Sequence, residues 1–322
     1  MHCHVAGIGA EGSACFVSSK LLHSWRFSVY LRSFGVSKRE LREQGDSVVV
    51  DHLSERLAQS RFVTRAVVLA LDGMIDAQGI LDTNRTSVYV PNEFVAEHVR
   101  AHSNLLFGAS INPYRRDALD RLAWAKTNGA VLVKWIPSIM AIDPADTKLV
   151  QFYQKLVELD LPLLTHTGHE HSFGSANDAF SDPEKLRLPL RLGVTVIAAH
   201  FASTGRYDGE RSSDRLVRLM SEYPNLYSDI SSLTQLNKRG YLKEALTRPE
   251  SSGRLLYGSD YPLINTALVS PWYYWPRLGA REIIRISREK NLWDRDVKLK
   301  QALGTPRSVF ARSGELLAAS AH

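Results

Sequence analysis

The sequence contains little cysteine, with only Cys3 and Cys15 among its 322 residues. Two cysteines cannot supply the disulfide framework that holds small secreted domains together, so the fold depends on a packed core. No apolar run approaches the roughly 20 residues that a membrane-spanning helix needs. The N-terminus also lacks the basic segment and apolar stretch of a secretory signal peptide. We therefore expect a cytoplasmic protein that does not engage a membrane.

The sequence also lacks a strong excess of charge of one sign. Its formal charge of +6 results from 40 basic and 34 acidic residues, which are interleaved along the chain. Proteins that bind nucleic acids usually concentrate positive charge in one patch or stripe. We therefore expect a solvated surface and a small-molecule substrate, with no nucleic-acid partner.

Short apolar runs rich in β-branched residues recur along the chain and predict strands that are buried on both faces. Seven of them follow the N-terminal segment, at 63–71, 105–111, 130–136, 161–165, 194–199, 225–230 and 254–257. Amphipathic segments with helix start and stop residues lie between them, at 91–102, 117–128, 146–159, 182–192, 212–223 and 236–247. This alternation indicates a parallel sheet covered by helices.

The number of strands predicts an α/β fold of the (β/α)8 TIM-barrel type. The eighth strand would be the one that ends at His2, so the first strand of the barrel is largely missing from this chain. We predict a single domain over residues 1–313 and a small, polar, flexible tail over 314–322. Residues 18–51 are less regular and are interpreted as an elaborated first loop and helix.

Polar side chains mark the ends of several predicted strands. On a strand, residues i and i+2 point to the same face, so His2 and His4 aim two imidazoles at one point. Cys3 then faces the other way, and we expect it to be a packed thiol. Four further polar residues directly follow or end apolar runs: Lys134, His166, His200 and Asp260. Because active sites of barrels lie where strands end, we expect all of these side chains to converge there.

Imidazole and carboxylate groups are good ligands for zinc and related divalent ions. Three or four protein ligands leave a position for water, whose pKa a bound cation can lower to about 7. A carboxylate that contacts both the ion and the water can accept the proton and deliver it to a leaving group. The pattern therefore predicts a divalent-metal site, with zinc as the expected ion and Asp260 as the catalytic proton shuttle.

As a set, these motifs resemble the amidohydrolase superfamily. The residues that carry the resemblance are His2-x-His4, Lys134, His166 in Leu-Leu-Thr-His-Thr-Gly, His200 in Val-Ile-Ala-Ala-His and Asp260 in Tyr-Gly-Ser-Asp-Tyr-Pro. The best match is the amidohydrolase-related branch, which includes aminocarboxymuconate-semialdehyde decarboxylase-like proteins. The segment from Lys300 to Phe310 is also similar to the end of that branch, although Thr305-Pro306 stands where Asn-Ala is common.

The resemblance implies that His2, His4, His166 and Asp260 hold the more deeply set metal ion. In two-metal relatives a carboxylated lysine bridges the ions and a further histidine binds the second one; Lys134 and His200 occupy those positions. In one-metal relatives that histidine is not a ligand and instead polarises the substrate or the bound water. The resemblance therefore leaves open whether the site binds one ion or two. An uncarboxylated Lys134 that pairs with Asp260 or with a substrate carboxylate also stays open.

Loops that follow barrel strands commonly carry substrate contacts. Glu170 and His171 are candidates in the loop after His166, and Asp72 and Asn112 are candidates at two other strand exits. Asp72 could equally cap its loop, and Asn112, which precedes a proline, could belong to a turn. His169 is expected at the surface. The aromatic segment 272–275 is interpreted as a pocket lid or a subunit interface, which leaves a homodimer open.

These observations predict a metal-dependent hydrolase that acts on a small amide, lactone or cyclic amide, with His200 as oxyanion polariser or second-metal ligand. The alternative within the family is a metal-dependent, non-oxidative decarboxylase of an unsaturated or aromatic acid. The alternative from another class is a metal-free binding or regulatory barrel. The missing first strand would leave an open seam beside the metal site. We expect a strand encoded upstream of the assigned start methionine, with a true truncation as the alternative.

Overall fold

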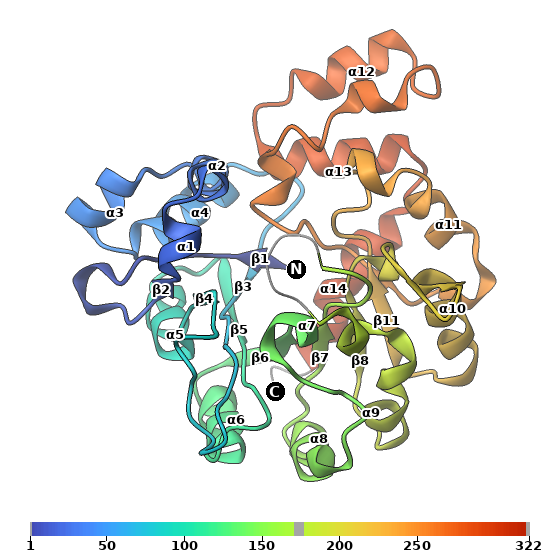
Figure 1. Cartoon of the computed structure of the whole chain (residues 1–322). Helices are drawn as coiled ribbons and strands as arrows, with labels where there is room; N and C mark the ends of the chain where they lie inside the picture. Colours follow the sequence, from blue (N-terminus) through green and yellow to red (C-terminus); the bar gives the residue numbers. More distant parts are fainter. Residues whose placement is uncertain (1, 171–176, 320–322) are drawn as a thin grey trace.

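The computed structural model describes residues 2–170 and 177–319. At its centre is a curled parallel sheet of eight strands in the order β1-β3-β5-β6-β7-β8-β11-β12 (Figure 1). The strands are β1 (Cys3–His4), β3 (Ala66–Leu69), β5 (Leu105–Ala109), β6 (Ala130–Trp135), β7 (Leu163–Thr165), β8 (Val196–Ala198), β11 (Leu226–Asp229) and β12 (Leu255–Leu256). Each of the seven apolar runs contains one of these strands, so the predicted parallel α/β fold is confirmed.

Helices alternate with the strands and surround the sheet in Figure 1. They are α5 (Asn92–Arg100), α6 (Ala118–Thr127), α7 (Pro137–Met140), α8 (Val150–Glu158), α9 (Arg187–Arg191), α10 (Ser212–Glu222), α11 (Tyr241–Thr247), α12 (Ala280–Ser287), α13 (Leu292–Ala302) and α14 (Arg307–Ala319). The predicted helix at 236–247 is interrupted, because Gly240 adopts a φ of 96°. Residues Leu236–Lys238 instead form a separate 3-10 turn, η6, and the helix α11 begins after it.

The N-terminal segment after β1 forms a small layer of its own beside that strand (Figure 1). It contains α1 (Ser19–Leu22), α2 (Trp25–Phe34), α3 (Lys38–Gln44) and α4 (Val48–Ala58). The short strand β2 (Phe16–Val17) pairs antiparallel with β4 (Val88–Tyr89), which ties this layer to the loop after β3. A second short antiparallel pair, β9 (Arg206–Tyr207) and β10 (Glu210–Arg211), lies before α10. Local caps explain two of the helices: Ser24 caps α2, and Ser37 with Glu40 forms a capping box on α3.

Strand β1 is only two residues long, yet it joins both sides of the sheet at the mouth of the barrel. Cys3 and His4 pair with Val68 and Leu69 of β3. On the other side Cys3 bridges to Tyr261, and the His4 amide donates to the Tyr261 carbonyl at 2.8 Å. The strand is short, as expected, but the open seam expected beside the site is closed at this level by main-chain hydrogen bonds.

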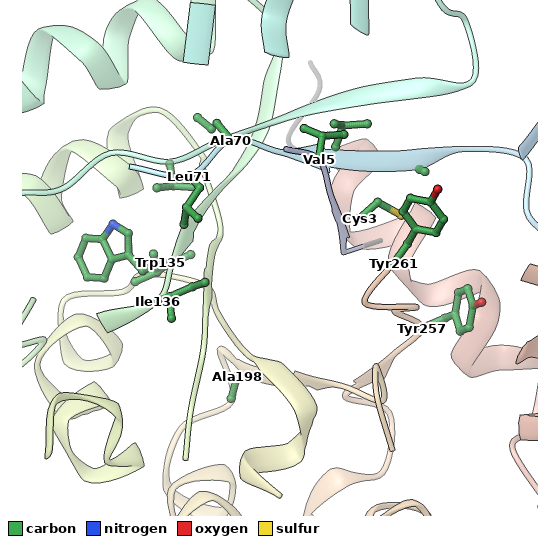
Figure 2. Close-up of a cluster of buried hydrophobic side chains, with 14 of the residues drawn as sticks. Cys3, Val5, Ala70, Leu71, Trp135, Ile136, Ala198, Tyr257 and Tyr261 are labelled. Carbon is green, nitrogen blue, oxygen red and sulfur yellow. The ribbon is translucent and has the colours of Figure 1, made fainter. Parts of the chain in front are cut away.

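Cys3 lies on the outer face of this junction, beside Tyr261 in Figure 2. Its side chain is 1% exposed, and its Sγ lies 3.5 Å from the Ser259 hydroxyl. The same figure shows Val5, Leu71, Trp135 and Ile136 in the surrounding apolar cluster. The alternation of side chains along β1 therefore places Cys3 in the core, on the side opposite to His4, as the sequence predicted.

Helix α14 covers the free edge of β12 and its continuation. The Tyr257 amide donates to the Val309 carbonyl, the Ser313 hydroxyl donates to the Tyr257 carbonyl at 3.0 Å, and Arg312 donates to the Leu255 carbonyl at 2.7 Å. These bonds satisfy backbone groups that a neighbouring strand would otherwise have to pair.

The end of α14 departs from the sequence-based expectation of a flexible tail from residue 314. The helix continues to Ala319, and Leu317 is 5% exposed. Leu317 packs against side chains of the interior face of the sheet, including Val67, Leu132 and Leu164. Burial of this apolar side chain stabilises the helical conformation of the segment. The small, polar composition of the segment does not reveal this contribution. The assignment of the chain to a single domain stays a prediction.

Replacing Leu317 by alanine is expected to lower the free energy of unfolding by about 2 kcal/mol, because a buried apolar side chain leaves a cavity at the base of the sheet. Chemical denaturation of the variant and the native chain measures the difference. Leu119→Ala on α6 is the control, since Leu119 is 39% exposed and its loss should cost little. Equal midpoints for Leu317→Ala and the native chain would show that the helix end does not contribute to the core.

Within the two described ranges, no helix is both long enough and apolar enough to cross a lipid bilayer.

Candidate metal centre

The polar residues singled out from the sequence meet at the carboxyl ends of the strands. His2 and His4 come from β1 and its start, Lys134 from β6, His166 and His200 from the residues after β7 and β8, and Asp260 from the segment after β12. All of them line one cavity of about 310 Å³. The convergence expected from strand ends is therefore present in the structure.

The distances between these groups suit a shared cation. Asp260 Oδ1 lies 3.4 Å from His4 Nε2 and 3.6 Å from His2 Nε2. Two atoms that bind one ion at about 2.1 Å cannot be more than about 4.2 Å apart, so Asp260 fits a common ion with either histidine. Ligand atoms of His2, His4 and Asp260 all lie within 4.8 Å of one another, which makes the three a candidate metal-binding group. Lys134 Nζ lies 3.2 Å from His2 Nε2 and forms no ion pair with Asp260 within the described residues. The pairing of Lys134 with Asp260, one of the alternatives left open, is therefore not observed.

His166 and His200 complete the cluster. Their ring centroids are 5.3 Å apart, and the His200 ring stacks on His2 at 5.0 Å. His166 Nε2 is buried and forms no hydrogen bond in the described part of the chain, although Glu170 Oε2 lies 3.5 Å from it. A buried ring nitrogen without a hydrogen bond is costly unless something binds it, and a metal ion would do so. The donor set therefore fits a divalent ion.

The backbone at these positions is unusual. His2, His200 and Asp260 have φ values of 69°, 60° and 58°, in the left-handed region that residues other than glycine rarely adopt. Such strain persists only where the surrounding structure enforces it, and it is concentrated at functional sites. All three of these residues line the same cavity.

Asp229, at the end of β11, binds two of the histidines: the ring of His2 and the backbone amide of His200. It is fully buried, and its Oδ2 lies 2.9 Å from His2 Nδ1. Its Oδ1 accepts hydrogen bonds from the amides of His200 at 2.9 Å and of Ser231 at 3.1 Å. A carboxylate on one ring nitrogen fixes the tautomer and leaves the other nitrogen, here Nε2, available to a metal.

The Ser231 hydroxyl settles the proton arrangement on His200. Its single proton is donated to Asp229 Oδ1, and its oxygen lies 2.8 Å from His200 Nδ1. His200 Nδ1 therefore donates to Ser231, and the unprotonated Nε2 faces the cavity and Asp260. In this tautomer His200 offers a lone pair to the site, which suits a ligand better than an oxyanion donor.

Burial sets the charge states of the cluster. Burial, with help from the Lys134 charge, lowers the pKa of His2 to about 4. Burial also lowers the pKa values of His166 and His200. For Asp260, burial raises the pKa, but the charges of His200 and His2 outweigh it and bring the pKa well below its usual range. At neutral pH the site thus presents His2, His166 and His200 as neutral imidazoles and Asp260 as a carboxylate, the forms that bind metals.

Lys134 is also affected by its surroundings. Burial lowers its pKa to about 8, although the carboxylates of Asp229 and Asp260 oppose the shift. An appreciable fraction of the side chain is then a neutral amine near neutral pH, which is the form that carbon dioxide carboxylates. The lowered pKa of Lys134 therefore makes carboxylation of its amine chemically accessible.

The four predicted substrate contacts have different outcomes. Glu170 lines the cavity, and its side chain is 7% exposed. His171 lies outside the described residues. Asp72 and Asn112 do not line the cavity. Asp72 instead forms a bidentate ion pair with Arg115, both bonds at 2.6 Å, and accepts from the Asn112 amide at 2.7 Å.

The Asn112 side chain is committed to loop carbonyls, donating to Gly73 at 2.9 Å and to Met140 at 2.8 Å. Asp72 and Asn112 therefore hold the loops after β3 and β5, and the expectation of substrate contact is corrected for both. His169, expected at the surface, has a side chain that is 33% exposed and also lines the cavity. Trp272 and Trp275 are 54% and 56% exposed and lie outside the cavity lining, so they do not form a lid over it.

Sequence reasoning missed Asp229 and Lys238, which is 8% exposed and lines the cavity. Asp229 ends the apolar run 225–230, and the same rule that selected Lys134 and Asp260 would have selected it. Lys238 was hidden inside a predicted helix, because the sequence did not reveal that Gly240 separates η6 from α11.

The sequence model described as amidohydrolase matches residues 58–288 of this chain. Among solved structures, an uncharacterised TIM-barrel protein from Bordetella bronchiseptica has a TM-score of 0.61 and 15% identity, with 100% of this chain and 99% of that chain covered. This similarity supports the barrel fold.

Two other solved structures have lower scores. 5-Carboxyvanillate decarboxylase from Sphingomonas paucimobilis has a TM-score of 0.47 and 10% identity over 100% of this chain and 96% of that chain. A dihydroorotase from Campylobacter jejuni has a TM-score of 0.43 and 17% identity over 66% and 65%. No curated protein sequence matches the chain.

Proposed function

Because the chain belongs to the amidohydrolase family, we propose that it is a metal-dependent hydrolase that cleaves a small amide, lactone or cyclic amide. The observation that carries the proposal is the approach of His2 Nε2 and His4 Nε2 to Asp260 Oδ1, at 3.6 Å and 3.4 Å, inside a buried cavity. His166, whose Nε2 is buried without a hydrogen bond, would be a further ligand.

A divalent ion, with zinc as our choice, supplies one piece of chemistry when bound: it lowers the pKa of a coordinated water to about 7. The side chains of this protein supply the rest. Asp260 is held as a carboxylate, and the Ser232 hydroxyl donates to its Oδ2. Asp260 Oδ1 is thus the atom placed to accept a proton and pass it to a leaving group.

His200 presents its unprotonated Nε2 to the same cavity. This favours the arrangement in which His200 is a ligand of a second ion over the one in which it polarises a carbonyl. Lys134, whose Nζ lies 3.2 Å from His2 Nε2, would supply a further oxygen ligand to the site when carboxylated. The two-ion form with a carboxylated Lys134 is therefore the version that we propose.

Elemental analysis of protein purified without chelator tests the proposal. We expect two equivalents of zinc or a related ion per chain, and hydrolysis of some members of a panel of amides and lactones that is lost after dialysis against chelator; one equivalent would contradict the two-ion form alone. Well under one metal ion per chain, with cavity residues intact, would instead support a metal-free binding barrel.

A non-oxidative decarboxylase is the second candidate, and one observation favours it. Two lysine side chains, Lys134 and Lys238, line the same cavity and would attract a substrate carboxylate. Release of carbon dioxide from aromatic or unsaturated acids, measured beside the hydrolysis assays on the same sample, separates the two reactions.

Replacing Asp229 by asparagine is expected to weaken zinc binding by about 10–100-fold, because the orienting partner of a metal-binding histidine is lost. The asparagine keeps the size of the side chain but not the charge that fixes His2 Nδ1 as a donor. Competition with a chromogenic chelator measures the affinity. An unchanged zinc affinity would show that Asp229 does not orient a ligand.

A further inference from the structure

The cavity has two chemically different walls. The apolar wall includes Val17, Leu21, Phe27, Phe34, Leu71 and Leu263. The polar wall includes His166, Glu170, His200, Thr204, Gln235 and Lys238. Apart from Leu263, the apolar residues come from the segments that follow β1 and β3, and the polar ones follow β7, β8 and β11.

The order of the strands places these walls on opposite sides of the mouth. Strands β1 and β3 are neighbours, and they are separated from β7 by β5 and β6 and from β11 by β12. Leu263 follows β12, which adjoins β1 through the Cys3–Tyr261 bridge, so it extends the apolar side. A bound molecule would therefore meet apolar side chains at one end and charged ones at the other.

Lys238 is the residue of the polar wall that most favours a bound anion. It is 8% exposed, and no hydrogen bond or ion pair of its ammonium group is found within the described residues. The three carboxylates whose charges act on Lys238 have other partners: Asp229 binds His2 and Ser231, Asp260 faces the histidine cluster, and Glu170 Oε2 lies 3.5 Å from His166 Nε2. A buried cation without a partner is unfavourable, and an anionic ligand group would relieve that cost.

The electrostatics of the site are consistent with this position. Burial lowers the pKa of Lys238, although the carboxylates of Asp260, Glu170 and Asp229 oppose the shift. The Lys238 charge in turn helps to lower the pKa of His200, which lines the same cavity.

Building on the proposed function, we propose that the substrate is an organic anion with two dissimilar ends. Its anionic group binds at Lys238, and its aromatic or branched aliphatic group packs against Leu21, Phe27 and Phe34. The reacting group then lies between them, over His4 and Asp260. A cavity of about 310 Å³ is near the lower end of the range for small-molecule sites, which suits a molecule with a single ring.

Calorimetric titration with three probes tests the assignment: 3-phenylpropionate, its neutral analogue 3-phenylpropanamide, and propionate, which lacks the ring. The native protein should prefer 3-phenylpropionate to both others by about tenfold or more, the factor that corresponds to one charged hydrogen bond. Lys238→Met should weaken 3-phenylpropionate binding by about tenfold and leave 3-phenylpropanamide binding unchanged. Leu21→Ala should weaken binding of both phenyl compounds.

Lys243→Met is the matched control, because Lys243 is exposed on α11 and outside the cavity lining. Equal affinity of the native protein for the acid and the amide, or for the acid and propionate, would overturn the proposal without reference to any variant. So would the absence of binding at millimolar concentrations, or acid binding that Lys238→Met does not change. Metal content measured on the same sample distinguishes failure of the metal-dependent hydrolase proposal from failure of the proposed anion binding at Lys238. Metal-free protein that binds 3-phenylpropionate through Lys238 would refute the metal chemistry and support this inference.

Discussion

Asp260→Asn is expected to reduce hydrolysis by about 10²–10⁴-fold, the contribution typical of a positioned proton-transfer group. The substitution keeps the size of the side chain, so the Ser232 hydroxyl retains an oxygen to bind. It removes the negative charge that faces His2, His4 and His200 at 3.6, 3.4 and 3.9 Å. We expect the variant to lose much of its bound metal as well, because a carboxylate is replaced by a weak, neutral ligand.

The measurements are metal stoichiometry and turnover of whichever panel compound the native protein hydrolyses. Asp120→Asn is the control, since Asp120 is an exposed residue of α6. It should retain native metal content and rate. An Asp260→Asn protein with a full complement of metal and native turnover would show that Asp260 neither binds the ion nor moves the proton.

Replacing Lys300 by methionine is expected to lower the free energy of unfolding by about 3–5 kcal/mol, because the change leaves a buried carboxylate without its partner. Lys300 is 0% exposed, and its ammonium donates to Asp296 at 2.7 Å and to the Gly258 carbonyl at 2.9 Å. Asp296 also accepts from the Tyr257 hydroxyl at 2.9 Å and the Thr234 hydroxyl at 3.4 Å. This pair on α13 therefore anchors the segments that carry Asp260 and Lys238.

Denaturant unfolding measures the effect, with Lys290→Met at an exposed position as the control. The double variant Asp296→Asn with Lys300→Met should recover part of the lost stability, because it no longer buries an unpaired charge. If Lys300→Met unfolds at the native midpoint, the buried pair does not hold these segments. Equal losses in the single and double variants would show that hydrogen bonds to Gly258 and Tyr257, rather than the charge, dominate.

Strand positions and the inward-facing ligand residues follow from local chemistry. Parallel strands buried on both faces have to be continuous apolar runs, which is why runs such as 130–136 and 225–230 predict β6 and β11. The alternation of side chains along a strand puts Cys3 and His4 on opposite faces without any knowledge of the fold. His2 also lines the cavity, but it precedes β1 and has a φ of 69°. Polar residues at strand ends, such as His166 and Asp260, then converge because all parallel strands end at the same edge.

The other features depend on contacts between segments that are distant in the sequence. Asp72 and Asn112 also lie at strand ends. Their side chains are already bound, Asp72 to Arg115 and Asn112 to loop carbonyls, so they are not available to a substrate. Lys238 lies outside helix α11 because Gly240, with a φ of 96°, separates η6 from that helix. Leu317 is buried among side chains that come from other strands of the sheet. Sequence periodicity therefore determined which residues point inward. Only the tertiary structure decided which of those residues are left without a partner, because hydrogen bonds and ion pairs between loops form only after the chain has closed.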